Sequence, residues 1–245
     1  MVTLRAQGQT FDNIQAIIFD KDGTLANVES YLKSLGQKRA RLVDAQVPGV
    51  QEPLLLAFGV ESTYLNPMGL MAVGSRRESI VAAAAYVAET GRDWAEALEI
   101  AIAAFTEADS YLKNKAEHTP LFPALQDWLP QLATAGLQLG VLSADTPQNV
   151  EDFVKTYQLQ TLISRHQGVD GLLSKPDPRL YEAICQQLDV PPSQTLMIGD
   201  STLDMRMAQA AGSAGRIGVT WGWQKPVIID HADLLIDQPH QLEIL

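Results

Sequence analysis

Short, almost continuous apolar runs limit the folds open to this chain more than any other feature. They cover residues 16–20, 137–145, 195–200, 216–222 and 232–237, and four of the five end at an aspartate. Apolar runs without polar alternation predict strands that are covered on both faces, as in a parallel sheet. Helical patterns lie between the later runs, and several begin with Pro, Thr or Asp. We therefore predict an α/β fold with a Rossmann-like three-layer core around a parallel sheet.

The stretch from residue 27 to residue 115 interrupts this alternation. It contains no clear strand pattern, and its periodicity predicts several helices. Prolines near residue 120 indicate a break in regular structure, and the alternation of strands and helices resumes after it. We predict two domains: a core of residues 1–26 and 116–245, and a small all-helical domain of residues 27–115 that is inserted after the first strand.

The chain of 245 residues has a formal net charge of −11, which argues against nucleic acid or an anionic membrane as a partner. An anionic substrate would need local positive charge, and a metal ion would supply it. The single cysteine, Cys185, excludes an intrachain disulfide and is expected to be buried in a helix. No apolar run has the length of a signal-peptide core or a membrane span. We expect a cytoplasmic protein, either a monomer or a dimer.

The segment AIIFDKDGTLA, residues 16–26, places Asp20 and Asp22 two residues apart at the end of a predicted buried strand. Two carboxylates about 4 Å apart repel by roughly 4 kcal/mol at an effective dielectric near 20. A divalent cation or a proton on one partner would relieve this repulsion, and both suit a nucleophile beside a general acid. Gly23 allows close approach of a ligand, and Thr24 offers a hydroxyl at a predicted helix N-terminus. A capping turn at the surface is the alternative interpretation.

Two more aspartates, Asp200 and Asp204, lie at and after the end of the run at residues 195–200. If a helix begins at Ser201, the i, i+4 spacing places both carboxylates on one face. Carboxylate oxygens are ligands that Mg²⁺ prefers, so the pair is a candidate metal site. A helix cap formed by Asp200, with a solvated Asp204, is the alternative.

Lys175 stands directly before the first of two prolines in SKPDPRLY, which restricts the backbone beside it. It would either neutralise nearby carboxylates or lie in solvent. Ligands of open parallel sheets bind beyond the carboxyl ends of the strands. Because Asp20, Ser143 and Asp200 all stand at the ends of predicted strands, we expect them to converge on one edge of the sheet.

Four segments, FDKDGTL, VLSADT, SKPDPRLY and IGDSTLDM, stand in the order of the four motifs of the haloacid dehalogenase superfamily. Within it, the chain resembles phosphatases related to phosphoglycolate phosphatase, which carry a helical cap after the first motif. The resemblance covers nearly the whole chain. It implies a Mg²⁺-dependent phosphatase that hydrolyses a small phosphorylated metabolite, such as phosphoglycolate or a sugar phosphate, through an aspartyl-phosphate intermediate.

The resemblance also implies roles for individual residues. Asp20 resembles the nucleophile, Asp22 the general acid and base, and Lys175 the lysine that steadies the phosphoryl group. The phosphate would be bound by the residues that match the family's phosphate-binding positions, namely Gly23, Thr24, Ser143, Ala144 and Lys175.

The magnesium ion would be held by Asp20, by the backbone carbonyl of Asp22 and by Asp200. Asp204 would support these ligands without binding the metal directly, or it would orient Lys175. Two residues depart from the family pattern. Lys21 stands where an apolar or aromatic residue is common, and we expect it to contact solvent or the cap, with a role toward the substrate as the alternative. Ala144 stands where asparagine is common.

Several alternatives share parts of this pattern. Asp22 argues against a dehalogenase and against a phosphonate-cleaving relative, because both lack the second aspartate. A sugar-phosphate mutase shares every motif and is the principal alternative, and a catalytically silent binding protein is another. In the cap, Arg76 and Arg77 are candidates for binding a second anionic group of the substrate, or they lie at a solvated helix N-terminus.

Overall fold

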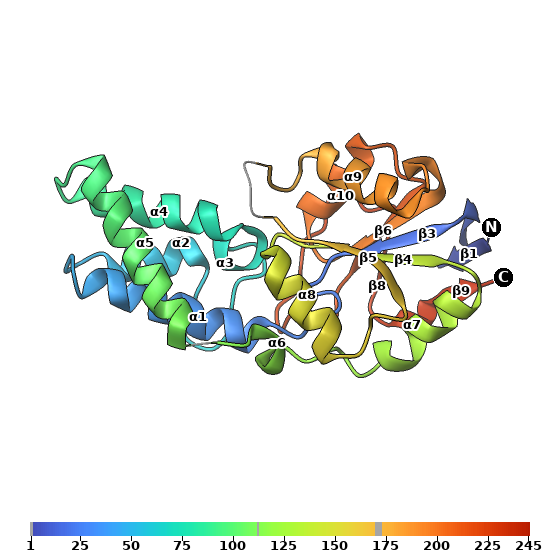
Figure 1. Ribbon diagram of the computed structural model, residues 1–245, viewed down its shortest axis with the longest axis horizontal. Coiled ribbons are helices and arrows are strands. Elements are labelled where there is room, and N and C mark those ends of the chain that lie inside the picture. The colour runs from blue at the N-terminus through green and yellow to red at the C-terminus, as the bar shows by residue number, and fades with distance from the viewer. Residues whose placement is uncertain (1, 112, 170–172) are drawn as a thin grey trace. The chain divides into compact units, whose positions relative to one another are not determined.

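The structure, a computed structural model, describes residues 2–111, 113–169 and 173–245 (Figure 1). The chain divides into two compact units: an α/β unit of Met1–Val28 and Thr119–Leu245, and a helical unit of Glu29–His118. The predicted borders after residues 26 and 115 fall two and three residues before the corresponding divisions (28 − 26 and 118 − 115).

A six-stranded parallel sheet forms the centre of the α/β unit, which confirms the predicted fold class. Its strand order is β5-β4-β3-β6-β7-β8. Both central strands are buried along their whole length because helices cover both faces of the sheet. The strands are β3 (Ala16–Phe19), β4 (Gln138–Leu142), β5 (Ile163–Gln167), β6 (Thr195–Gly199), β7 (Gly215–Val219) and β8 (Leu234–Ile236).

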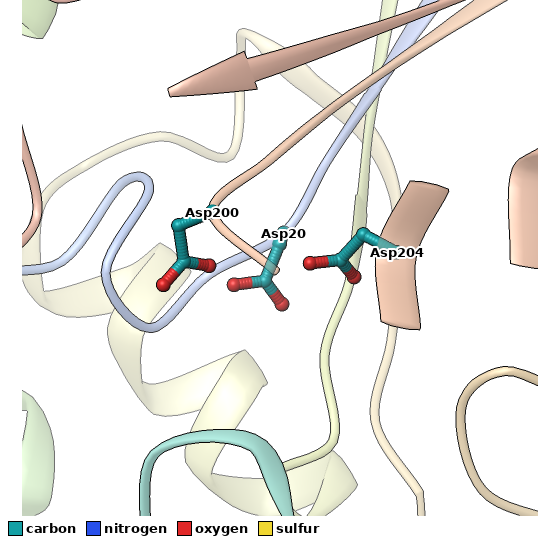
Figure 2. A group of neighbouring side chains, drawn as sticks. All are labelled: Asp20, Asp200 and Asp204. Carbon is teal, nitrogen blue, oxygen red and sulfur yellow. The ribbon is translucent and has the colours of Figure 1, made fainter. Parts of the chain in front are cut away.

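The register of the central strands brings three chain segments out of the sheet together. Phe19, the last residue of β3, lies opposite Val141 of β4 and Ile198 of β6. The segments that follow these strands therefore leave the sheet at the same edge, and Asp20 and Asp200 lie there side by side (Figure 2).

Helices α9 (Pro178–Leu188) and α10 (Thr202–Ala210) lie on one face of the sheet, and α7 (Leu125–Thr134) and α8 (Pro147–Thr156) lie on the other (Figure 1). Successive side chains of β3 point to opposite faces of the sheet, as in any β-strand. Ile18 belongs to the core beneath α9, whereas the ring of Phe19 packs edge-on against Trp128 of α7, with centroids 5.8 Å apart.

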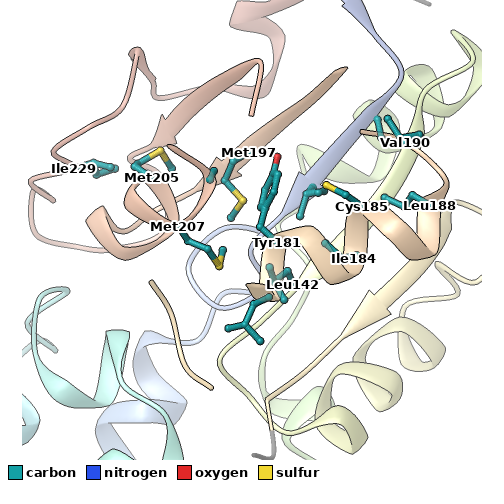
Figure 3. Packing of buried hydrophobic residues seen from close by; sticks show 14 residues of the cluster. Leu142, Tyr181, Ile184, Cys185, Leu188, Val190, Met197, Met205, Met207 and Ile229 are labelled. Atoms are coloured by element: carbon teal, nitrogen blue, oxygen red, sulfur yellow. The ribbon is translucent and has the colours of Figure 1, made fainter. Parts of the chain in front are cut away.

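The core on the α9 and α10 face joins side chains from both helices to the sheet (Figure 3). Gly140 of β4 gives α9 room to approach, because a Cβ there would lie 3.2 Å from Cδ1 of Ile184. Cys185 is buried in this core, as expected. The cluster consists of Ala16, Ile18, Leu142, Leu180, Tyr181, Ile184, Cys185, Leu188, Val190, Met197, Met205, Met207, Ala208 and Ile229.

A second, antiparallel sheet that we did not predict joins the two ends of the chain. Its order is β2-β1-β9, with β1 at Val2–Ala6, β2 at Gln9–Ile14 and β9 at Leu242–Ile244. The N- and C-terminal ends therefore lie close together (Figure 1). The sheet lies at the opposite end of β3 from Asp20 and takes no part in the site.

The helical unit packs through small side chains, because buried alanines of α4 and α5 allow the two helices to approach closely. Within the described residues, no helix combines the length and the apolar character that a membrane crossing requires. The helices are α1 (Glu29–Asp44), α2 (Gln51–Phe58), α3 (Leu70–Val73), α4 (Arg76–Glu89), α5 (Trp94–Tyr111) and α6 (Lys115–His118).

Truncation of Ile184 tests the packing of α9 on the sheet. Ile184→Ala should lower the free energy of unfolding by about 2–5 kcal/mol, because it leaves a cavity under a fully buried side chain. Ile228→Ala is the matched control, since that side chain is 61% exposed, and it should change the stability by less than about 0.5 kcal/mol. Urea unfolding measures both variants, and equal losses would contradict this packing.

Candidate active site

Three buried carboxylates meet at the carboxyl edge of the parallel sheet (Figure 2). Asp20 follows β3, Asp200 follows β6, and Asp204 lies in the first turn of α10. Each offers one oxygen, and these oxygens all lie within 4.8 Å of one another. We call these three residues the acidic group. The set of oxygen donors suits a hard cation such as Mg²⁺.

Lys175 neutralises part of this charge. Its Nζ lies 2.6 Å from Oδ1 of Asp20 and 2.6 Å from Oδ1 of Asp204. Burial alone would lower the pKa of Lys175, but the carboxylates of Asp20 and Asp204 raise it above its ordinary value, so the lysine is charged. The interpretation of Lys175 as a solvated side chain is therefore wrong.

With all three carboxylates ionised, the acidic group would keep a net negative charge even with this lysine, and burial together with mutual repulsion opposes that ionised state. Burial raises the pKa of Asp20 to about 6, although the ion pair with Lys175 lowers it and Asp204 raises it further. Burial, Asp20 and Asp204 likewise raise the pKa of Asp200. Three ionised carboxylates and one lysine sum to −2, so a divalent cation would fit both the charge and the donor type.

The turn after β3 brings the backbone against the acidic group. Gly23 has φ = +83°, and a Cβ at this position would lie 2.3 Å from Oδ2 of Asp200, so only glycine fits here. The Thr24 hydroxyl donates to Oδ1 of Asp200 at 3.3 Å. The prediction that Thr24 lies at a helix N-terminus is wrong: the backbone carbonyl of Lys21 accepts amides from residues 24–26 in a turn, and α1 begins only at Glu29.

The helix after β6 also differs from the prediction. Ser201 is the N-cap of α10: its Oγ accepts the amide of Asp204 at 3.2 Å, and its hydroxyl also donates to that carboxylate at 2.6 Å. Asp200 lies before the helix and is not its cap, so the expected i, i+4 helix face does not exist. The two carboxylates meet because the chain turns between β6 and α10.

Lys21 and Asp22 lie beside the acidic group and form a separate charge cluster. Lys21 is only 1% exposed, so the expected contact with solvent is wrong. Its Nζ forms an ion pair with Oδ1 of Asp22 and lies 3.1 Å from Oδ2 of Asp145. The carboxylate of Asp22 does not belong to the acidic group and is held by Lys21 instead.

The loop after β4 begins with Ser143, which is buried at the same sheet edge. Its Oγ accepts the amide of Asp145 at 3.1 Å. Ala144 is partly buried, and α8 begins three residues later with Thr146 as its N-cap. The Ser143 hydroxyl and the start of this loop therefore lie at the end of β4, and their binding of a phosphate stays a prediction.

The two candidate arginines of the helical unit differ from each other. Arg76 begins α4 and donates from Nε to Oδ2 of Asp109 at 2.8 Å, whereas Arg77 is exposed. Arg39 donates to the other oxygen of the same carboxylate at 2.8 Å. Two arginines thus share one aspartate, which leaves an excess of one positive charge.

Two tryptophans at this edge were missed from the sequence. Trp223 donates from its indole nitrogen to Oδ2 of Asp200 at 2.5 Å, and Trp221 donates to the carbonyl of Thr24 at 3.0 Å. Gly222 lies between them against the turn after β3, because a Cβ there would lie 1.9 Å from the carbonyl oxygen of Gly23. Their position at the end of the predicted strand at residues 216–222 was the available signal.

Comparison with known proteins gives a coherent result. A family model described as haloacid dehalogenase-like hydrolase matches residues 14–212. A phosphoglycolate phosphatase from Synechococcus elongatus is 32% identical over 124 residues, which make up 50% of this chain and 57% of that protein. The match therefore spans little more than half of that relative. The phosphoglycolate phosphatase of Escherichia coli is 27% identical over 224 residues, or 90% of this chain and 86% of that protein.

Solved structures share the fold at lower identity. A predicted phosphoglycolate phosphatase from Haemophilus somnus has a TM-score of 0.69 at 21% identity and covers 93% of this chain and 95% of its own. A putative β-phosphoglucomutase from Thermotoga maritima has a TM-score of 0.61 at 16% identity and covers 93% and 96%. At these identities, the two structures show that the fold is shared and show nothing about activity.

Removal of Lys175 tests the electrostatics of the acidic group. Lys175→Met should lower the free energy of unfolding at neutral pH in EDTA by about 3–5 kcal/mol, because it leaves buried carboxylates without their cation. Asp204→Asn in the same chain should restore part of this loss.

Urea unfolding measures these changes, with Lys155→Met as the control. Lys155 is a 57% exposed lysine that pairs with Glu151, and its removal should leave the unfolding midpoint unchanged. If Lys175→Met behaved like this control, the proposed charge compensation would be absent.

Proposed function

Because the chain belongs to the haloacid dehalogenase-like hydrolase family, we propose that it is a Mg²⁺-dependent phosphatase of small phosphomonoesters that acts through an aspartyl phosphate. Relatives named phosphoglycolate phosphatase support this activity and make phosphoglycolate the first substrate to test. The observation that carries the proposal is the ion pair between Asp20 and Lys175 within a group of three buried carboxylates.

Asp20 is the proposed nucleophile. One of its carboxylate oxygens forms a bond to phosphorus as the bond from phosphorus to the ester oxygen breaks. Asp22 gives a proton to the departing oxygen, and it later takes a proton from the water that attacks phosphorus as the bond from phosphorus to the Asp20 oxygen breaks and phosphate is released. Lys175 holds Oδ1 of Asp20 in place and offsets negative charge as the phosphoryl group arrives.

Asp20, Asp200 and the backbone carbonyl of Asp22 are the proposed ligands of Mg²⁺, which would offset the charge of the phosphate and of the acidic group. Asp204 holds Lys175 at 2.6 Å and is assigned to orienting it. The indole of Trp223 fixes the direction of the Asp200 carboxylate.

The phosphate itself would be bound by groups at the ends of β3 and β4. The buried hydroxyl of Ser143 and the amide of Ala144 are the proposed donors from β4. Gly23 permits close approach of the ligand, Thr24 orders the turn through Asp200, and Lys175 supplies positive charge.

The helical unit, Glu29–His118, is assigned the role of a cap that selects the substrate. The pair of arginines that share Asp109 supports binding of a second anionic group, such as the carboxylate of phosphoglycolate. Arg76 is 37% exposed and is the proposed contact, with Arg77 beside it in sequence.

Asp20→Asn should reduce phosphate release by at least about 10³-fold while the protein stays folded, because an amide oxygen is a poor nucleophile. Steady-state assays with phosphoglycolate and p-nitrophenyl phosphate measure this loss, and Asp127→Asn on the exposed side of α7 is the matched control. Acid quenching of the wild type should leave a phosphoryl group on Asp20, detectable by peptide mass.

Turnover by Asp20→Asn at the wild-type rate would contradict the covalent route. Transfer of the phosphoryl group to a second sugar without phosphate release would favour the sugar-phosphate mutase.

Mg²⁺ should raise the thermal midpoint of the wild type at neutral pH, by an amount equivalent to about 2.7 kcal/mol at a concentration 100 times the dissociation constant. Asp200→Asn should shift this titration to higher concentrations, because one proposed ligand is lost. Differential scanning fluorimetry after EDTA treatment measures the shift, with Asp127→Asn again as the control. An identical titration for Asp200→Asn would remove Asp200 from the metal site.

A further inference from the structure

Lys21 is a buried charge that the proposed reaction does not use. Its side chain is 1% exposed, and its Nζ contacts two carboxylates, those of Asp22 and Asp145. The Nζ also lies 5.7 Å from the centre of the Phe153 ring in α8. Burying an ammonium group costs several kcal/mol unless nearby groups compensate it. The carboxylates of Asp22 and Asp145 provide this compensation, so the three side chains depend on one another.

Asp145 is a fixed anchor for this lysine. Its Oδ1 accepts the amide of Thr146 at 2.9 Å and the side-chain amide of Asn149 at 2.7 Å. Its backbone carbonyl accepts the amide of Val169 at 2.7 Å. Oδ2 of the same carboxylate faces Lys21 at 3.1 Å. The loop after β4 thus holds a carboxylate in one orientation toward the turn after β3.

The other end of the lysine is equally constrained. The backbone carbonyl of Lys21 accepts the amides of Leu25 and Ala26, each at 2.9 Å, which close the turn that carries Asp22. Because both the backbone and the ammonium group are held, the Asp22 carboxylate bound to that ammonium has a defined position. This position lies outside the acidic group that contains Asp20.

We propose that Lys21 is a positioning residue that holds the carboxylate of Asp22 where it exchanges protons with the leaving oxygen and then with water, and that Asp145 holds Lys21. The proposal rests on the function proposed above, in which Asp22 is the general acid and base. General acid catalysis depends on hydrogen-bond reach to the reacting oxygen, so a carboxylate released from its partner loses part of its effect.

A lysine that only joined two loops would produce a different result from one that positions Asp22. Loss of a structural link lowers stability and lowers the turnover of all substrates alike. Loss of positioning affects most strongly the substrates whose leaving oxygen needs a proton. Alkyl phosphates have such leaving groups, whereas the p-nitrophenolate leaving group departs without one. The ratio of kcat/KM for the two substrate classes separates the two roles, since kcat/KM covers steps up to departure of the leaving group.

The experiment compares phosphoglycolate, or another alkyl phosphate that the wild type hydrolyses, with p-nitrophenyl phosphate. Lys21→Met removes the charge at similar length. It should lower kcat/KM for the alkyl phosphate by about 10- to 100-fold, which is part of the roughly 10²- to 10⁴-fold that general acid catalysis contributes, and by less than about threefold for the aryl phosphate. Asp145→Asn should produce the same selectivity to a smaller extent. Lys155→Met, which removes an exposed lysine, should change neither value.

A second background isolates Asp22. In Asp22→Asn, the further change Lys21→Met should have no effect on kcat/KM for either substrate, because the group to be positioned is absent. Equal losses for both substrates, or a loss that persists in the Asp22→Asn background, would overturn the proposal and leave a structural link.

Controls separate this proposal from the function on which it rests. Circular dichroism and urea unfolding show whether Lys21→Met folds. If it does not, Asp145→Asn serves as the test variant. Equal changes in kcat/KM for alkyl and aryl phosphates in Asp145→Asn would then overturn the proposal. A wild type without Mg²⁺-dependent turnover, or an Asp22→Asn variant with full activity, overturns the proposed function and the positioning role together. Wild-type activity with unselective Lys21 and Asp145 variants overturns only the positioning role.

Discussion

The concentration of buried negative charge at one edge of the sheet is the constraint on which the rest of the site depends. Asp20, Asp200 and Asp204 place oxygens within 4.8 Å of one another, and each desolvated carboxylate costs several kcal/mol unless it is compensated. Lys175 contacts two of them, and Trp223 and Thr24 donate hydrogen bonds to the third. Because net negative charge remains, binding of a cation would stabilise this edge of the sheet. A phosphate site that uses a metal ion needs such an affinity for cations.

The part of this arrangement that follows from strand order was predictable from the sequence. Continuous apolar runs predict strands that are covered on both faces, and strands of that kind form parallel sheets whose carboxyl ends share one edge. The convergence of Asp20 with Asp200 follows from that rule alone, although they lie 180 positions apart in the chain (200 − 20). Lys175 joins the group because its segment lies directly before α9, which packs on the same sheet.

The parts that depend on contacts between distant segments were not predictable. β9 pairs with β1 at the other end of the chain, and a segment of three residues shows no local signal for such a pairing. The carboxylates of Asp200 and Asp204 meet through a turn rather than a helix face, because Ser201 takes the capping position. Lys21 gave no sign of burial in the sequence, because its second carboxylate partner, Asp145, comes from the distant loop after β4.

The DxD pair of this chain keeps its two carboxylates compatible by giving each its own lysine. Asp20 pairs with Lys175, whereas Asp22 pairs with Lys21, so neighbours in the sequence lie in different charge clusters. The proposed phosphoryl transfer requires different chemistry of the two groups: Asp20 is proposed to attack phosphorus, and Asp22 is proposed to exchange protons with oxygen. Pairs of carboxylates with divided roles are separated by their environments in many enzymes. Here that separation is made by two buried ammonium groups, which are anchored by Asp204 in the first turn of α10 and by Asp145 in the loop after β4.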